Sequence, residues 1–245
     1  MMLTSLNTEK IGAPLVDALT SVGYWVEHGA KNFEGWDFYD PRTWHDFARC
    51  WDDLLLDEYM RDGGTYRFRR YSQLFYSAND GDLRLLPHAP YEQPAVINRL
   101  NGGFQRHFGA IEDRLLENRF LKGLMQWMGN SYSAASGHRN WNIKLHPYRI
   151  VATQGPGQPS PEGLHRDGVD YICSLMVRKC NVDGGETIVT DVNQNELVRF
   201  TLKMPGDIMV ADDNIIMHGV SPIQIINRRM SVAYRDVLVV AFTKD

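Results

Sequence analysis

The sequence predicts a mainly β protein with packed α-helices, whose core is a double-stranded β-helix, the cupin-like jelly roll. From residue 142 to the C-terminus, apolar segments spaced about 8 to 12 residues apart alternate with turn-forming residues, as in antiparallel sandwiches and barrels. Upstream, two segments have apolar residues at helical spacing, which predicts amphipathic helices that cover one sheet face. We expect a single domain over residues 1–245, with 1–137 covering the barrel and 138–245 forming the jelly-roll core.

The N-terminal part begins with a predicted helix over residues 14–21, started by Pro14, and a strand at Tyr24-Trp25-Val26. Asp40-Pro41 predicts the start of a second helix, which we expect to end at Gly63-Gly64. Its apolar residues recur at helical spacing, which is typical of a core-facing stripe. They are Trp44, Phe47, Trp51, Leu54, Leu55 and Tyr59.

The middle of the chain predicts a strand, a loop and a third helix. Residues 65–75 alternate and predict a strand with an arginine-bearing face. Residues 86–93 form a proline-spaced loop, and Gly102-Gly103 further on predicts a tight turn or a close backbone approach. A helix is expected over 111–128 with Gly129 as its end.

The C-terminal part predicts a strand over Asn142–Thr153 and short strands after it. Each is bounded by residues that favour turns. The expected turns are 181–185, 193–195, 204–207, 212–214 and 227–228.

Composition narrows the function classes. The formal net charge is −4 with both signs interspersed, so no face for nucleic acid is indicated. Cys50, Cys173 and Cys180 are an odd number without C-x-x-C spacing, which indicates free thiols in a reducing compartment. No signal-peptide pattern and no apolar run of the ~18 residues needed for a membrane span is present. We expect a cytoplasmic protein that does not act at membranes.

Three residues form a candidate metal site. His165 and Asp167 lie two residues apart, so in an extended segment both side chains face the same side. His218 follows fifty-one residues after Asp167, in a segment expected at another strand end. Two histidines and one carboxylate can occupy one face of an octahedron, which is the ligand set of non-haem Fe(II) oxygenases. A bidentate 2-oxo acid and O2 could then fill the open positions.

A 2-oxo acid with a distal carboxylate needs a buried cation, and arginine binds carboxylates bidentately while staying charged. The last strand offers Arg229 and Arg235. Residues 229, 231, 233 and 235 would share one face of an extended strand. Spacing alone leaves the choice between the two arginines open.

Several ordered segments resemble the bacterial 2-oxoglutarate/Fe(II) dioxygenase family whose best-known members are L-isoleucine hydroxylases. The resemblance begins at Arg67 to Tyr71 and leaves out only the first sixty-odd residues. Its clearest segments are 162–171 (EGLHRDGVDY), 184–187 (GGET), 218–222 (HGVSP) and 234–242 (YRDVLVVAF).

The resemblance implies Fe(II), 2-oxoglutarate and O2 as cofactor and co-substrates, with iron at His165, Asp167 and His218. It favours Arg235 as the 2-oxoglutarate anchor, although Arg228-Arg229 departs from the looser, proline-rich linker expected there. It also implies hydroxylation of a free, mainly aliphatic L-amino acid, with a homodimer left open as an assembly. The polar residues at matching positions that could bind this substrate are Gln93, Asn98, Arg106 and Arg149.

Two other functions are compatible with the same residues. A hydroxylase acting on peptide or protein side chains would need an open groove beside the iron, and a pocket closed by residues 86–106 would count against it. A non-catalytic, cupin-like metal or ligand sensor would not produce succinate. A halogenase is disfavoured because Asp167 fills the position that a halide would need.

Overall fold

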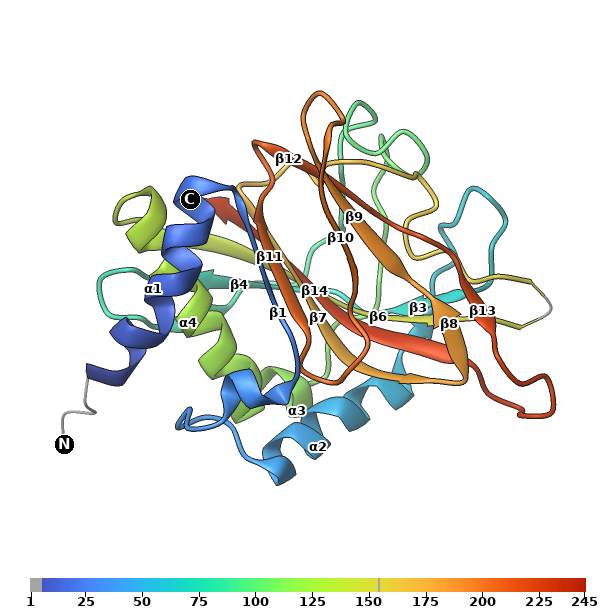
Figure 1. The fold of residues 1–245 in the computed structure, drawn as a ribbon, viewed down its shortest axis with the longest axis horizontal. Coiled ribbons are helices and arrows are strands. Elements are labelled where there is room, and N and C mark those ends of the chain that lie inside the picture. Colours follow the sequence, from blue (N-terminus) through green and yellow to red (C-terminus); the bar gives the residue numbers. More distant parts are fainter. Residues whose placement is uncertain (1–5, 154) are drawn as a thin grey trace.

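The computed structural model describes residues 6–153 and 155–245, and a nine-stranded antiparallel sheet dominates this part of the chain (Figure 1). Seven strands follow one another in the order β1-β11-β7-β14-β6-β3-β2, and β4 also pairs with β6 and with β5. The strands of this large sheet are β1 (Tyr24–Glu27), β2 (Leu55–Leu56), β3 (Arg67–Arg69), β4 (Ser72–Tyr76), β5 (Leu83–Leu85), β6 (Trp141–Val151), β7 (Tyr171–Cys180), β11 (Ile208–Asp212) and β14 (Tyr234–Lys244).

Two small sheets lie over one face of the large sheet (Figure 1). One has the order β10-β9-β12 and the other pairs β13 with β8. Apolar contacts join the layers: Leu202, which follows β10, packs with Met176 of β7 and Val237 of β14. This two-layer antiparallel arrangement confirms the predicted jelly roll. The small-sheet strands are β8 (Val182–Gly184), β9 (Glu186–Asp191), β10 (Glu196–Thr201), β12 (Ile216–Val220) and β13 (Ile223–Ile225).

The helices gather on the opposite face of the large sheet (Figure 1). The longest of them, α4, buries Phe120, Leu124 and Met128 in the main core, as expected for an amphipathic covering helix. The helical elements are α1 (Leu6–Ser21), the 3₁₀ turns η1 (Ala30–Phe33) and η2 (Cys50–Asp53), α2 (Pro41–Arg49), α3 (Asp113–Leu116) and α4 (Arg119–Ser136).

Strand alternation separates the two faces of the large sheet. In β14, Leu238, Val240 and Phe242 point into the helix-covered core. Arg235 and Val237 point to the opposite face, where they line a pocket between the sheets. The period-two pattern therefore sends polar side chains into the jelly roll while the helices bury the apolar face.

Two predicted helix boundaries in the N-terminal part are wrong. Helix α1 begins at Leu6 and continues through Pro14, which costs the helix one backbone hydrogen bond and does not mark its start. Helix α2 begins after Asp40 as predicted, because Asp40 Oδ1 accepts from the backbone N–H groups of Arg42 and Thr43 at 2.9 Å. It ends at Arg49, far short of the predicted Gly63-Gly64, because residues 55–56 instead pair with β3 at the sheet edge.

The predicted strand over 65–75 is interrupted between β3 and β4, and the predicted helix over 111–128 is two helices. Asn118 caps the second, α4, by accepting from the backbone N–H of Phe120 at 2.9 Å. Gly129 does not end α4, which runs to Ser136. A Cβ at Gly129 would lie 2.9 Å from the Tyr76 ring, so this glycine allows close packing.

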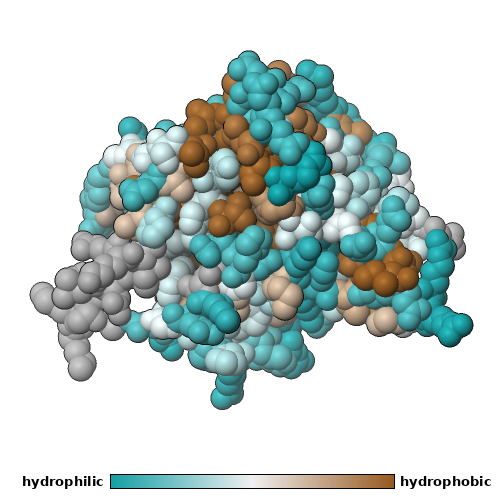
Figure 2. Space-filling model, viewed as in Figure 1, coloured by the Kyte–Doolittle hydropathy of each residue, from teal (hydrophilic) through white to brown (hydrophobic). Residues whose placement is uncertain are grey.

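The structure describes the three cysteines as free thiols, as predicted. Among the described residues, no helix combines the length and the apolar character needed to cross a bilayer. Figure 2 shows exposed apolar side chains in separate patches among hydrophilic ones on the face it presents. Exposed apolar residues of this kind are ordinary on protein surfaces. They include Val192, Leu197, Ile226, Met230 and Val232.

A buried ion cluster ties β6, β7 and β14 together on the side of the sheet away from the pocket. Asp236 is fully buried and accepts from Arg149 Nε at 2.7 Å and from Arg178 Nε at 2.8 Å. Both arginines also contact Asp52, which is half exposed.

We expect Asp236→Asn to lower the free energy of unfolding by about 3 kcal/mol, because it removes the buried counter-ion of two arginines and leaves them only the half-exposed Asp52. Asp52→Asn is the matched control and should cost at most about 1 kcal/mol, since that carboxylate is solvated. Urea unfolding of both variants measures the difference. Equal losses would show that burial of Asp236 contributes nothing extra.

Candidate metal centre and substrate pocket

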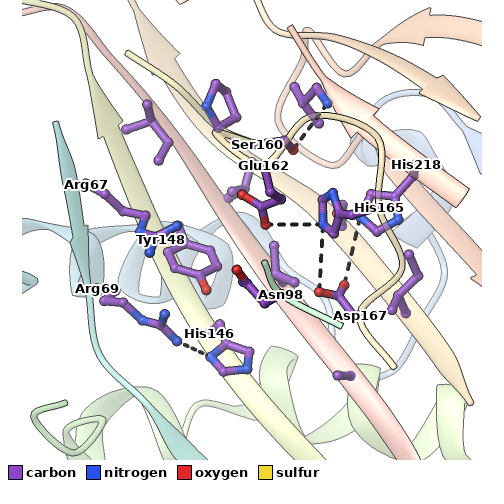
Figure 3. Close-up of a pocket in the computed structure, with 18 of the residues that line it drawn as sticks. Arg67, Arg69, Asn98, His146, Tyr148, Ser160, Glu162, His165, Asp167 and His218 are labelled. Carbon is purple, nitrogen blue, oxygen red and sulfur yellow. Dashed lines mark hydrogen bonds and ion pairs between the residues drawn. The ribbon is translucent and has the colours of Figure 1, made fainter. Parts of the chain in front are cut away.

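The pocket lies between the large sheet and the small sheets, on the face of β14 that carries Arg235. Strands β3, β6, β7, β9, β11, β12 and β14 contribute to its wall. The segment 91–106 and the loop 159–169 complete it (Figure 3). Its polar lining residues are Arg67, Arg69, Tyr91, Gln93, Asn98, Arg106, His146, Tyr148, Ser160, Glu162, His165, Asp167, Ser174, Thr187, His218 and Arg235.

His165, Asp167 and His218 converge on one side of this pocket (Figure 3). One ligand atom of each lies within 4.8 Å of the others. Asp167 Oδ1 is 3.9 Å from His165 Nε2, and its Oδ2 is 3.9 Å from His218 Nε2. The backbones of the two histidines exchange a pair of hydrogen bonds at 2.9 Å, so sheet pairing places one imidazole beside the other.

The hydrogen bonding of His165 selects the nitrogen that is free for a metal. Its Nδ1 lies 2.8 Å from the carbonyl oxygen of Gly163, so Nδ1 carries the hydrogen and donates it. The lone pair is then on Nε2, which faces Asp167. Burial and the neighbouring His165 hold the pKa of His218 well below its usual value, which favours the neutral form that ligates metals.

Asp213 fixes the loop that presents Asp167. Its carboxylate accepts from the backbone N–H groups of Asp167, Gly168 and Val169 at 3.0, 2.7 and 3.1 Å. Burial and the charge of Asp167 raise the pKa of Asp213 to about 6, against the effect of these hydrogen bonds. The predicted turn at 212–214 thus has a positioning role that the sequence did not reveal.

Arg235 presents a buried guanidinium to the pocket. The residue is 4% exposed, its Nε has no hydrogen-bond partner, and no carboxylate of the described residues forms an ion pair with it. Burial lowers the pKa of Arg235 to about 10. A buried cation without a counter-ion is costly, so this position favours an anionic ligand.

The model of the 2OG-Fe dioxygenase family matches residues 48–241, most of the chain. The chain belongs to this family. The dioxygenase is 26% identical over 197 residues to L-isoleucine-4-hydroxylase of Bacillus thuringiensis, which covers 77% of this chain and 80% of that protein.

Solved structures share the dioxygenase fold. A bsmA homologue from Methylobium petroleophilum superposes with a TM-score of 0.87 at 30% identity, covering 95% of this chain and 92% of that one. IDO from Bacillus thuringiensis superposes with a TM-score of 0.78 at 20% identity, covering 96% and 99%. The jelly roll is therefore shared along nearly the whole chain.

The family implies Fe(II), 2-oxoglutarate and O2 for this dioxygenase, and the pocket fits them. Two imidazoles and one carboxylate on one side of a cavity are the donor set of a non-haem Fe(II) centre. The unpartnered Arg235 suits the distal carboxylate of 2-oxoglutarate. Because the chain is a dioxygenase, the sensor interpretation is not supported.

The structure separates the two candidate anchors. Arg229 is exposed in the turn before β14, and the strand does not begin until Tyr234. The expected shared face of residues 229 to 235 is therefore wrong, because extended backbone does not reach Arg229. Gly185, in the predicted 184–187 motif, lies directly against Arg235: a Cβ there would be 3.3 Å from Arg235 Nε.

Three of the four predicted substrate residues line the pocket, and one does not. Gln93, Asn98 and Arg106 line the pocket and form one network, in which Gln93 Oε1 accepts from Arg106 Nη2 at 3.0 Å and from Asn98 Nδ2 at 3.3 Å. Arg149 does not join them. Strand alternation places Arg149 on the face of β6 away from the pocket, where its guanidinium pairs with Asp236 and Asp52. Its prediction as a substrate ligand is therefore corrected.

Several pocket residues were missed by the site prediction. Arg69 is fully buried beside His146, with its Nη2 2.5 Å from His146 Nδ1, and its guanidinium lies 3.8 Å from the Phe108 ring centroid. Arg67 pairs with buried Asp57 at 2.8 Å. Period-two alternation over 65–75 had indicated an arginine-bearing face but not its burial. Glu162 also lines the pocket. It belongs to a segment that carries the family resemblance, but no role was predicted for it.

Proposed function

We propose that this dioxygenase hydroxylates a free, mainly aliphatic L-amino acid at an unactivated side-chain carbon. His165, Asp167 and His218 would hold the iron, and Arg235 would bind the distal carboxylate of 2-oxoglutarate. When bound, Fe(II) with 2-oxoglutarate and O2 supplies the oxidant, and the products are the hydroxyamino acid, succinate and CO2. The protein's task is to place one C–H bond beside the metal and hold it there.

The buried guanidinium of Arg106 is the observation that carries the amino-acid proposal. Arg106 is 1% exposed, its Nε has no partner among the described residues, and its hydrogen-bond acceptor there is the neutral amide of Gln93. Its guanidinium also lies over the Tyr91 ring, 4.7 Å from the centroid. A second unpaired cation besides Arg235 calls for a second anionic group, which the α-carboxylate of an amino acid would provide.

Gln93 would link this carboxylate site to the metal. Its Nε2 donates to the carbonyl oxygen of Asp167 at 3.3 Å, while its Oε1 accepts from Arg106. Asn98 holds Gln93 in place by donating from its Nδ2 to Gln93 Oε1. The Oδ1 of Asn98 accepts from the backbone N–H of Asn101 at 2.7 Å, so both ends of this amide are engaged by the protein. We assign Arg106 and Gln93 to substrate contact and Asn98 to positioning.

Apolar residues offer a surface for the substrate side chain. The pocket wall includes Val169, Ile172, Met209 and Ala241. Such a wall suits an aliphatic chain and offers no group that would discriminate by acid-base chemistry. The curated relative named L-isoleucine-4-hydroxylase supports the same substrate class.

A peptide or protein substrate is the alternative. It would need an open groove or a free strand edge beside the metal. Here Tyr91, Gln93, Asn98 and Arg106 of the 86–106 segment wall the pocket. This wall supports a small free substrate over a polypeptide.

The test is a panel of free L-amino acids incubated with the enzyme, Fe(II), 2-oxoglutarate and ascorbate, scored by mass for one added oxygen. We expect aliphatic amino acids to be hydroxylated and their N-acetyl amides to be inert. Shortening the side chain by one methylene should cost only about 1 to 3 kcal/mol. Blocking the carboxylate should cost more, since it leaves the buried Arg106 without its anion.

Arg106→Met separates substrate binding from the metal chemistry. It should raise the KM of the best free amino acid while leaving 2-oxoglutarate binding intact. Comparable turnover of free and doubly blocked amino acids by the unmodified enzyme would contradict the proposal and favour the peptide hydroxylase.

A further inference from the structure

Glu162 is a carboxylate in the pocket wall that receives no hydrogen bond from the described residues. Its side chain is 14% exposed, and its Oε2 is buried without a partner. Its Oε1 lies 3.5 Å from His165 Nε2. Figure 3 shows this carboxylate in the middle of the pocket, between Tyr148 on one side and His165 on the other.

In the form of the site that binds iron, the contact with His165 does not satisfy Glu162. His165 donates its Nδ1 hydrogen to Gly163, so a neutral His165 has a lone pair and no hydrogen on Nε2. A metal on Nε2 would use that lone pair and would likewise leave no donor. Both oxygens of Glu162 therefore lack a donor in the form of His165 that can bind iron.

Neighbouring groups do not neutralise Glu162 either. Arg67 is engaged by Asp57, with Nε and Nη2 both 2.8 Å from Asp57 Oδ2. No Lys or Arg of the described residues lies within ion-pair distance of Glu162, whose one ion-pair contact is His165. Glu162 is also outside the group of ligand atoms that lie within 4.8 Å of one another. A largely buried carboxylate without a donor is costly, so the site favours a cationic ligand.

We propose that Glu162 accepts the α-ammonium group of the substrate. This inference rests on the proposed function and deepens it, because it adds the second half of zwitterion recognition. Arg106 and Glu162 line the same pocket with opposite charges, and among the described residues Arg106 has no Asp or Glu partner and Glu162 has no Lys or Arg partner. A compact ammonium brings three donors to two free carboxylate oxygens. The pair would select α-amino acids over 2-hydroxy acids, 2-oxo acids and acylated amines.

The test compares two ligands on two proteins. The Mn²⁺-loaded enzyme with 2-oxoglutarate, kept free of oxygen, is titrated calorimetrically with L-valine, L-leucine and L-isoleucine. Each is paired with the 2-hydroxy acid of the same carbon skeleton, which replaces the ammonium by a neutral hydroxyl. In the unmodified enzyme, the amino acid should bind about 10- to 100-fold more tightly than its hydroxy acid, as expected for charge-assisted hydrogen bonds.

Glu162→Gln should remove this preference. We expect the amino acid to lose about 10- to 100-fold in affinity, while the hydroxy acid binds as before, which also shows that the variant is folded. Glu162→Asp, which keeps the charge, should recover part of the preference. Glu196→Gln on the surface of β10 is the matched control and should change neither affinity.

Different outcomes contradict different claims. If the amino acids bind the unmodified enzyme and Glu162→Gln leaves their advantage over the hydroxy acids intact, the role of Glu162 is wrong and the proposed function stands. If Glu162→Gln weakens Mn²⁺ binding and both ligands alike, Glu162 belongs to the metal site and the inference is overturned. If no amino acid binds the unmodified enzyme, the proposed function fails, and the inference fails with it.

Discussion

Asp167→Ala is expected to abolish hydroxylation while the protein stays folded. The substitution removes the single carboxylate from the His165, Asp167 and His218 set. Loss of an outer partner of a metal ligand already costs about 10- to 100-fold, so loss of the ligand itself should exceed this range. Asp167 lies on a loop at the pocket, and its side chain is 23% exposed, so little core packing is lost. Product mass and succinate formation measure the effect.

Asp183→Ala is the matched control, because Asp183 is exposed on β8 and away from the pocket. It should keep full activity. Thermal unfolding should give similar midpoints for both variants. Retained turnover in Asp167→Ala would contradict the assignment of the metal ligands, whatever the control does.

Arg235→Leu is expected to raise the KM for 2-oxoglutarate by about 10- to 150-fold, because a charge-assisted hydrogen bond is worth about 1.5 to 3 kcal/mol. Arg235 is buried and its Nε has no partner within residues 6–153 and 155–245, so the variant loses a ligand contact and no ion pair of the described part. Steady-state kinetics at varied 2-oxoglutarate, together with calorimetric binding to the Mn²⁺-loaded enzyme, measure the change. The affinity for the amino acid should change much less.

Arg229→Leu provides the comparison within the same segment. Arg229 is exposed in the turn before β14 and should tolerate the change. A large rise in KM for Arg229→Leu with a normal Arg235→Leu would reverse the assignment of the anchor.

The fold class could be predicted because strand periodicity and turn residues are local properties of the sequence. The convergence of His165, Asp167 and His218 could be predicted as well, because a two-residue spacing places the first pair together and the family motif places His218. The C-terminal ends of α2 and α4 could not be predicted. Gly129 has the composition of a helix stop, but its role is to admit the Tyr76 ring, which lies far away in sequence.

The roles of the arginines could not be predicted either, because they also depend on residues far away in sequence. Arg106 and Arg149 are the same residue type and both were expected at the substrate. Strand alternation places Arg149 beside the buried Asp236, on the face away from the pocket, whereas Arg106 lies in the pocket with the neutral Gln93 as its partner. The proposed role of Glu162 depends on the lack of a hydrogen-bond donor near its carboxylate among the described residues. Such a lack can be recognised only in the folded structure, where the neighbouring groups are known.

The most direct test of the central claim is the coupling of co-substrate consumption to substrate oxidation under ¹⁸O₂. The enzyme is incubated with Fe(II), 2-oxoglutarate and the best amino acid of the panel, and both products are quantified by mass. The account predicts one succinate for each hydroxyamino acid, with one ¹⁸O atom in the new hydroxyl group. Succinate formation that no free amino acid accelerates, with no labelled amino acid produced, would contradict it.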